Sequence, residues 1–498
     1  MTGDSSRDGR RSSINRRRFI AAAGAAGVAG LAGCSGGGGG EETTAHGTET
    51  TEGGMEGTTT GQQQETVTLR LWSGNMTDEP ANKTYWENAA QRANEKFNDF
   101  QIELRGVPYE GQFNKIRSAV QAGPESAPHI VEMASRKDTM LAADLLRIGD
   151  MYEGSEVQQA LSPGLANLQQ AWGEQMTGEE GAIINVPIGV RPYMNVYRQN
   201  WLDSAGLSVD DVSASHSWDK MFNSIYPAMK NSDKFKPDQG TFPDTTGMKE
   251  GDEEFLSHYA GQWGLTTMGT LNDAATHSLL DTKEYRDLIK FQVNGIDKQF
   301  FHSNSINHGD EEATTLIWND QLGMIHVQDV ADLWGSFKGE LGADTYEQEY
   351  TWSVPNHANK KSTYGLVPIF VPFAEAYTSQ AERDAFMKFT NWFATGQEAV
   401  RRTKNVGFVP PDPSALEADW FSSTSLHEKF WSTAKATLEN FQVTELPAIE
   451  GGSRINFEIP RQMHQRILQQ GMSVKEATKI AAEEQNNILR QNGRYKPR

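Results

Sequence analysis

Short strand patterns alternate with helix patterns from residue 66 onward, and this alternation constrains the fold more than any other feature. Residues 66–72 read Thr-Val-Thr-Leu-Arg-Leu-Trp, which is typical of a strand with one buried face. Strand patterns recur at residues 101–107 and 128–135, after helix patterns that carry Trp86 and Phe113. Strands and helices at this spacing predict a parallel sheet covered by helices, and therefore an α/β fold.

Three extended segments divide the rest of the chain. Residues 185–197, 364–371 and 407–411 each contain proline and lack a helical period. Such segments suit crossings between two lobes that are joined by hinges. Ligands of open α/β sheets bind at the carboxyl ends of strands, so we expect a site in a cleft between the lobes. The predicted first lobe comprises residues 66–187 and 368–408, and the second comprises residues 188–367 and 409–498.

Helix starts give the sharpest local predictions. Ser217 is an expected N-cap, and Ser379 with Glu382 forms an expected capping box whose helix turns Phe386, Phe389 and Phe393 inward. Asp138 is expected to cap a further helix. Residues 315–318 and 322–327 are expected to form two short strands around a turn.

The first 34 residues resemble an export and anchoring signal. An apolar run of 15 residues, 19–33, is too short to span ~30 Å of hydrocarbon but suits a signal peptide. Arg16 and Arg17 begin an Arg-Arg-Arg-Phe-Ile sequence that resembles the twin-arginine motif, and Leu31-Ala-Gly-Cys34 resembles a lipobox. Residues 1–33 would then be removed, and Cys34 would carry a diacyl group that anchors firmly. The alternative is a chance arginine run before an ordinary thiol.

Cys34 is the only cysteine, so the chain can form neither an internal disulfide nor a cysteine-based metal site. Residues 35–65 consist largely of glycine, threonine and glutamine with six glutamates and no lysine or arginine. This composition cannot bury enough apolar surface to fold. We therefore expect residues 34–65 to be a lipidated cysteine and a flexible linker that spans roughly 30 Å.

The chain is strongly acidic. Its formal net charge is −20, and it becomes about −24 without the six arginines and two aspartates that precede Cys34. A surface of this sign gains nothing from nucleic acid or anionic lipid, so neither is an expected partner. The acidity resembles that of proteins from extreme halophiles, and we interpret it as an adaptation to solvent.

An ordered set of short motifs extends through residues 66–492. The set comprises Gly123-Pro124, Pro187-Ile-Gly followed by Tyr-x-x-x-Tyr-Arg, Ala205-Gly-Leu, Ser217-Trp-Asp, Leu322-Gly-Met, Tyr364-Gly-Leu-Val-Pro and Gly407-Phe-Val-Pro. Together with the leader, it resembles the extracellular solute-binding proteins of family 1, the maltose-binding-protein-like carbohydrate binders of ABC importers. The resemblance implies a type II periplasmic-binding-protein fold that closes over one solute and docks on a permease. It also implies an anchored, extracellular, monomeric protein that binds a sugar or polyol and uses no cofactor.

The same resemblance assigns candidate ligand-binding residues to the cleft. Sugars present apolar faces and hydroxyl groups, so aromatic rings and planar polar side chains suit them. In the first lobe the candidates are Trp72, Ser73, Asn75, Tyr109, Gln112, Ser135 and Arg136. In the second lobe they are Arg191, Tyr193, Gln328, Asp329, Ser453 and Arg454.

Two of these candidates leave the charge of the solute open. Arg136 and Arg191 could clamp a carboxylate or phosphate, which would make the solute a sugar acid or a sugar phosphate. A salt bridge with one of the many acidic side chains is the alternative. Among the twelve tryptophans, Trp86, Trp218 and Trp392 lie in helical stripes and are expected in the core.

Catalytic motifs are absent from the sequence. It contains no G-x-S-x-G, no H-E-x-x-H and no P-loop. His302 and His308 lie in a polar stretch, and we interpret them as parts of a solvated loop and not as a metal pair. No enzymatic activity is expected. The alternative is a surface-anchored glycosidase or other carbohydrate-active enzyme, because carboxylate pairs are available throughout the chain.

Overall fold

The computed structural model describes residues 66–77, 80–134, 137–249, 254–330, 333–337 and 342–497. Arg16, Arg17, Cys34 and the predicted linker lie outside the described residues. From residue 66 the chain forms an α/β fold with two five-stranded sheets, one in each of two lobes. The predicted fold class is therefore confirmed.

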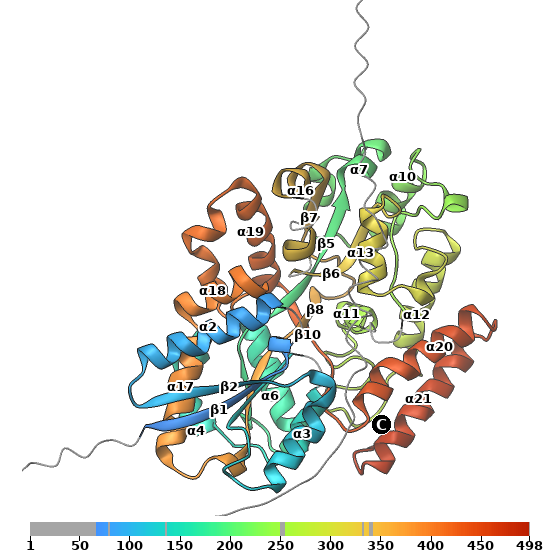
Figure 1. Ribbon diagram of the computed structural model, residues 1–498. Coiled ribbons are helices and arrows are strands. Elements are labelled where there is room, and N and C mark those ends of the chain that lie inside the picture. Colours follow the sequence, from blue (N-terminus) through green and yellow to red (C-terminus); the bar gives the residue numbers. More distant parts are fainter. Residues whose placement is uncertain are drawn as a thin grey trace, which may run out of the picture. The chain divides into compact units, whose positions relative to one another are not determined.

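The first sheet has the strand order β2-β1-β3-β9-β4 (Figure 1). β1 (Val67–Ser73) pairs in parallel with β2 (Phe100–Gly106) and with β3 (Ile130–Met133), as the alternation predicted. β9 (Ile369–Pro372) is antiparallel to β3 and to β4 (Val186–Pro187). The sheet is therefore mixed. The expectation of a purely parallel sheet is wrong for β9, which lies between β3 and β4 and enters from the second lobe in the opposite direction.

Aromatic side chains join the helices of the first lobe to its sheet. Trp86 of α2 (Pro80–Lys96) stacks on Phe393 of α17 (Gln380–Ala394), with ring centroids 5.0 Å apart. The capping box of Ser379 and Glu382 is present, and the three predicted inward phenylalanines of α17 are buried. The other helices of this lobe are α3 (Tyr109–Gln121), α4 (Gly149–Tyr152), α5 (Glu156–Ala160), α6 (Pro163–Thr177) and α18 (Gly396–Val406).

The second sheet has the order β10-β8-β5-β6, and a further strand, β7, also pairs with β5. β5 (Arg191–Arg198) is antiparallel to β6 (Met324–Asp329), β7 (Tyr350–Ser353) and β8 (Ser362–Leu366). β10 (Gln442–Thr444) is parallel to β8. This sheet is therefore mixed as well, and β5 is its central strand.

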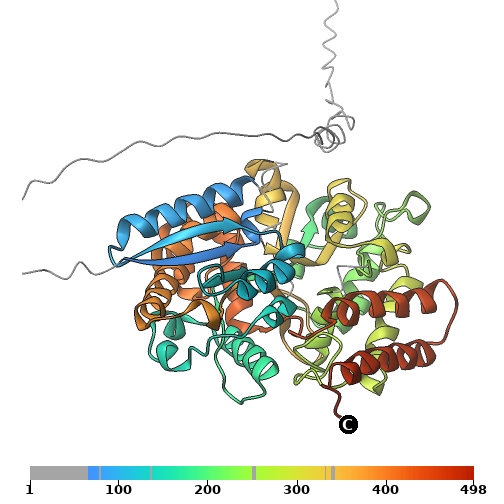
Figure 2. The same ribbon diagram turned by 60° about the horizontal axis from the view of Figure 1, so that its bottom comes forward.

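Helices surround the second sheet, and the last two, α20 (Ile459–Leu468) and α21 (Val474–Gln491), lie side by side (Figure 2). Ser217 caps α9 as predicted, since its side chain accepts a hydrogen bond from the Lys220 amide. None of the described helices combines the length and apolar composition that crossing a bilayer requires. The remaining helices are α7 (Gln199–Ala205), α8 (Val209–Val212), α9 (Trp218–Lys220), α10 (Tyr226–Lys230), α11 (Glu254–Trp263), α12 (Lys283–Asp297), α13 (Asp310–Trp318), α16 (Ala343–Glu349) and α19 (Ser425–Asn440).

Two local predictions are wrong. Residues 315–318 belong to α13 and not to a strand, because Ala313 and Ile317, four residues apart, are buried on one helical face. The helix expected after Asp138 is only a short 3₁₀ helix, Lys137–Ala142. Beyond it, Leu145 forms a bridge with Phe373, which keeps this segment extended.

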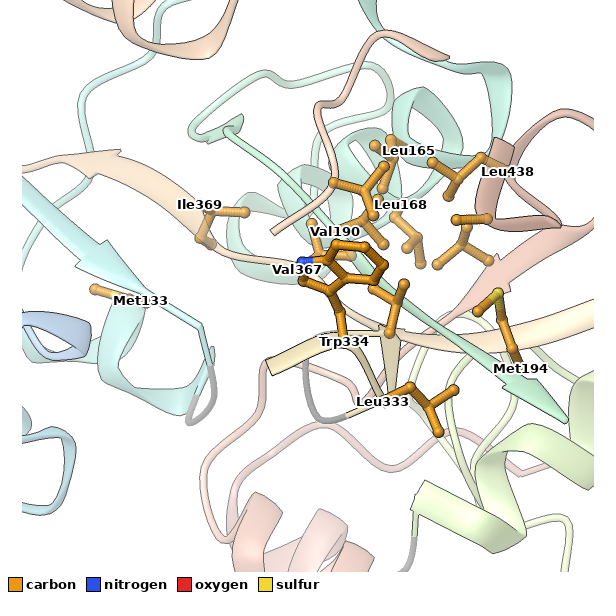
Figure 3. Close-up of a cluster of buried hydrophobic side chains, with 14 of the residues drawn as sticks. Met133, Leu165, Leu168, Val190, Met194, Leu333, Trp334, Val367, Ile369 and Leu438 are labelled. Atoms are coloured by element: carbon orange, nitrogen blue, oxygen red, sulfur yellow. The ribbon is translucent and has the colours of Figure 1, made fainter. Parts of the chain in front are cut away.

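The crossings between the two sheets are paired with each other and cover an apolar core. Val190 and Val409 exchange two backbone hydrogen bonds of 3.0 and 2.9 Å, which ties the first crossing to the third. Figure 3 shows the buried cluster at this level, with Met133 and Ile369 from the first sheet and Met194 from the second. The two lobes therefore share a buried apolar cluster at the level of the crossings.

Candidate ligand-binding site

Hydrogen-bond donors from the end of β1, the 3₁₀ turn after it and the start of α3 converge on Glu132, a residue of β3 with no exposed surface. Its Oε2 accepts hydrogen bonds from Ser73 Oγ at 2.9 Å and from the Asn75 amide at 3.0 Å. Its Oε1 accepts one from Tyr109 Oη at 2.9 Å. Gln112 Nε2 donates to the Glu132 backbone oxygen at 3.1 Å. We call these five residues the Glu132 group.

Burial and hydrogen bonding act in opposite directions on this carboxyl group. Burial raises the pKa of Glu132, and donors from Asn75, Ser73, Tyr109 and the Gly74 amide oppose the rise because they stabilise the carboxylate. A Cβ at Gly74 would fall 2.1 Å from the Tyr109 ring, so a larger residue there would displace that ring. The Glu132 group is therefore a fixed unit within one lobe.

Four of the predicted first-lobe residues, Ser73, Asn75, Tyr109 and Gln112, belong to this group. Asn75 is also held by the Trp86 indole, which donates to its Oδ1 at 3.0 Å. Trp72 is not part of the group. It is 5% exposed, packs in the core, and has the Arg105 guanidinium 4.9 Å from its ring centroid. Ser135 and Arg136 lie outside the described residues.

A second set of polar side chains joins the two lobes. Lys137 of the first lobe lies 3.0 Å from Glu445 Oε2 of the second, and both side chains are 2% exposed. Lys137 Nζ also donates to the Ala134 backbone oxygen and lies 5.1 Å from the Trp172 ring. Trp172 Nε1 in turn donates to the Leu446 backbone oxygen at 3.3 Å. Oppositely charged and aromatic side chains therefore meet between the lobes, away from solvent.

Two tyrosines of the second sheet complete this set. Tyr364 of β8 donates to Glu445 Oε1 at 3.0 Å. Its ring packs edge-on against Tyr193 of β5, with centroids 5.1 Å apart, and both rings are buried. Burial raises the pKa of Glu445, while Lys137 and Tyr364 oppose this rise. We call Lys137, Trp172, Tyr193, Tyr364 and Glu445 the interlobe group.

Arg191, the predicted anion ligand, lies at the crossings. Its guanidinium is 4.2 Å from the Phe408 ring centroid, and Nη2 donates to the Val406 backbone oxygen at 3.5 Å. These contacts link the start of β5 to the end of α18. Arg191 therefore takes part in the packing of the hinge region, whatever further role it has toward a solute.

The other second-lobe candidates are spread more widely. Gln328 and Asp329 are the last residues of β6, and Asp329 pairs with Tyr193 of the interlobe group along the backbone. Ser453 is half-buried. The Arg454 side chain is 62% exposed and lies 3.8 Å from Glu458. The structure thus places Asp329 beside the interlobe group and Arg454 on the surface.

The interpretation of His302 and His308 as parts of a solvated loop is wrong. His308 is 5% exposed, and the two ring centroids are 4.5 Å apart. His308 Nδ1 also lies 3.0 Å from Thr245 Oγ1. Burial lowers the pKa of each histidine to about 4, so both rings are neutral near pH 7. Within the described ranges no group of three or more His, Cys, Asp or Glu side chains could hold a metal ion.

Sequence reasoning missed several residues of both groups. Glu132 interrupts the apolar strand pattern of residues 128–135, and a charged residue in a buried strand is a usable signal. Lys137 follows the predicted Arg136 directly. Glu445 carries no local signal, because only the meeting of the two lobes gives it a partner.

Solved structures with the same fold match this chain over most of its length. The cyclic α-maltosyl-1,6-maltose binding protein from Arthrobacter globiformis superposes with a TM-score of 0.67 at 16% identity, covering 86% of this chain and all of that protein. The sugar-binding protein MalE from Xanthomonas citri gives a TM-score of 0.66 at 17% identity, covering 85% of this chain and 98% of that one. No family model matches the sequence, and no curated protein sequence matches it. At these identities the similarity establishes the two-lobed fold of periplasmic binding proteins.

Proposed function

We propose that the protein is the extracytoplasmic solute-binding component of an ABC importer, and that it binds a sugar or related polyol between its lobes. The observation that carries this proposal is the interlobe group, in which aromatic and hydrogen-bonding side chains from both lobes are buried together. Binding proteins of this fold close around a ligand by hinge motion. Similar structures include one described as an ABC transporter solute-binding protein with bound α-D-tagatose, from Thermotoga lettingae, which supports a sugar as the solute.

The chemistry of the two groups favours a neutral solute. Tyr193, Tyr364 and Trp172 are buried in the present arrangement, so their ring faces would become available to the apolar faces of a sugar only when the lobes separate. Lys137 and Glu445 carry opposite charges, so together they can donate to and accept from hydroxyl groups without selecting an anion. A sugar acid or sugar phosphate would need an additional cation, for which Arg136 and Arg191 are the candidates.

We further propose that the protein is exported by the twin-arginine route and anchored through Cys34. The order of Arg16, Arg17, the apolar run and the single cysteine supports this. A diacyl anchor followed by 31 linker residues would let the binding domain reach a permease in the same membrane. We expect Cys34→Ala to release the protein into the medium. Continued fractionation of this variant with membranes would contradict the lipid anchor.

The solute is tested on purified Cys34→Ala protein in high salt. A panel of neutral saccharides, sugar acids and sugar phosphates is screened by thermal shift, and positive compounds are measured by calorimetry. A true solute at 100 times its Kd stabilises the folded state by about 2.7 kcal/mol. We expect a shift from neutral saccharides and intact sugar after incubation. Sugar cleavage products would indicate a glycosidase, and no shift from any compound would contradict a sugar-binding role.

A further inference from the structure

A hollow of about 600 Å³ lies on the second lobe and contains no residue of the Glu132 or interlobe groups. Its walls come from α9 and the residues after it, one face of α12, the end of α11, and residues 358–359. Every one of these elements belongs to the second lobe. The hollow therefore exists whether or not the lobes close.

The floor of the hollow is aromatic. Phe291 of α12 lies at its centre, with ring centroids 4.8 Å from Trp263, 5.2 Å from Trp218 and 4.6 Å from Phe222. Trp218 and Phe222 are buried, whereas Trp263 and Phe291 are only half-buried. Part of each of these last two rings therefore faces the hollow, in positions fixed by the buried rings beneath them.

The rim carries polar groups that are not used elsewhere. Asp219, Asn223 and Asn294 line the hollow, are exposed, and make no side-chain hydrogen bond or ion pair within the described part of the chain. By contrast, Asn359 Nδ2 donates to the Trp263 backbone oxygen at 2.9 Å, which fixes one edge of the hollow. Two amides and a carboxylate thus remain available around the half-buried rings.

We propose that this hollow is a second saccharide-binding site, separate from the interlobe site. The exposed parts of Trp263 and Phe291 would stack on the apolar face of a sugar ring, and Asp219, Asn223 and Asn294 would bond its hydroxyl groups. The volume is within the range of small-molecule sites. Because one lobe supplies all contacts and no closure excludes water, binding is weaker than between the lobes. This proposal does not depend on the proposed importer function.

The test follows individual tryptophans in the Cys34→Ala protein labelled with 5-fluorotryptophan. The probes are maltotriose, cellotriose and mannotriose. Trp263→Phe assigns the Trp263 fluorine resonance, and Trp392→Phe assigns a matched control. Trp392 is also half-buried and lines a hollow, but that hollow, on the first lobe, is lined mainly by charged side chains. We expect at least one trisaccharide to shift the Trp263 resonance in a saturable way and to leave the Trp392 resonance unchanged.

The double variant Asn223→Ala/Asn294→Ala removes exposed amides and leaves the core intact. We expect it to weaken the Trp263 response at least tenfold while changing any tight binding measured by calorimetry less than twofold. No saturable shift of Trp263 with any of the three sugars, or an unchanged response in the double variant, would overturn the second site. If calorimetry on the Cys34→Ala protein detects no tight binding while the Trp263 resonance still shifts, the interlobe site is contradicted and this second site is not.

Discussion

The Glu132 group and the interlobe group are both buried and polar, but they are assembled in different ways. Every member of the Glu132 group belongs to the first lobe, and hydrogen bonds from four different groups hold its carboxyl in place. The interlobe group exists only where Lys137 of one lobe meets Glu445 of the other. One group is thus preorganised, whereas the other depends on the lobe arrangement.

Removal of the carboxyl group of Glu132 should have the largest effect on stability. Glu132→Ala leaves the Asn75 amide and the Ser73 and Tyr109 hydroxyl groups buried without an acceptor, which costs on the order of 4 kcal/mol. Urea unfolding measures the loss. Glu132→Gln, which keeps one acceptor oxygen, should recover part of it. Equal stability of the alanine variant and the unmodified protein would mean that the hydrogen bonds to the Glu132 carboxyl group do not stabilise the fold.

Breaking the interlobe pair should cost somewhat less, because opening of the lobes can rehydrate the remaining charge. Lys137→Met leaves Glu445 buried without its cation, a loss of about 3 kcal/mol in the closed arrangement. The double variant Lys137→Met/Glu445→Gln removes both charges and should regain most of that loss. X-ray scattering should show a more expanded particle for the single variant only. The same expansion in both variants would contradict the role of the pair.

Acid should destabilise the body of the second lobe. Burial lowers the pKa of His464 in α20 to about 4, against an ordinary value of 6.5. Between pH 6.5 and 4, His464 is therefore protonated in the unfolded chain but neutral in the folded chain. The free energy of unfolding falls as pH falls through this range, by up to about 3 kcal/mol. His464→Gln should reduce the dependence of the urea midpoint on pH across this range. The dependence that remains belongs to His129, His302 and His308, whose pKa values burial also lowers to about 4. An unchanged pH profile in that variant would assign the acid sensitivity to other groups.

A smaller change should separate the geometry of the Glu132 group from its charge. Gly74→Ala places a methyl group against the Tyr109 ring and should displace Tyr109 from Glu132 at a cost of about 2 kcal/mol. Solute affinity should fall as well if this loop contacts the solute. Gly111→Ala, in α3 close to Tyr109, would bring its Cβ only into ordinary contact with the Lys115 side chain, at 3.7 Å, and is the matched control. Similar losses in both variants would contradict a specific role for Gly74.

Arg454 should show the smallest effect. It is a sequence-derived candidate whose side chain is exposed and paired with Glu458 on the same helical turn. Arg454→Ala should change stability by less than about 0.5 kcal/mol. Calorimetry with the identified solute tests whether Arg454 contacts it. A tenfold loss of affinity in Arg454→Ala would support a contact, and unchanged affinity would contradict one.

The sequence predicted the elements better than their directions. The alternating pattern of residues 66–72 and the capping box at Ser379 identified β1 and the start of α17, because both depend on neighbours in the chain. The antiparallel entry of β9 and the helical state of residues 315–318 were missed. Each depends on which distant surface covers the segment, and that information is not local.

The candidate site divides in the same way. The resemblance to family 1 solute-binding proteins supplied Ser73, Asn75, Tyr109 and Gln112, as residues that follow the first two predicted strands. These residues nevertheless meet on Glu132, whose only signal in the sequence is a charge within an apolar strand pattern. The role of Glu445 could not be predicted from the sequence, because its partner Lys137 lies far away in the chain and meets it only when the two lobes come together.

By itself, the sequence determined the α/β class, the presence of two lobes and the acidic net charge, and it predicted an export-type leader. These follow from periodicity, composition and short motifs, which act over a few residues. The tertiary structure decided which strands are antiparallel, which carboxyl groups are buried with partners, and where aromatic rings remain half-exposed on the second lobe. Those outcomes depend on contacts between residues up to about 300 positions apart, such as Lys137 with Glu445, and no local pattern records them.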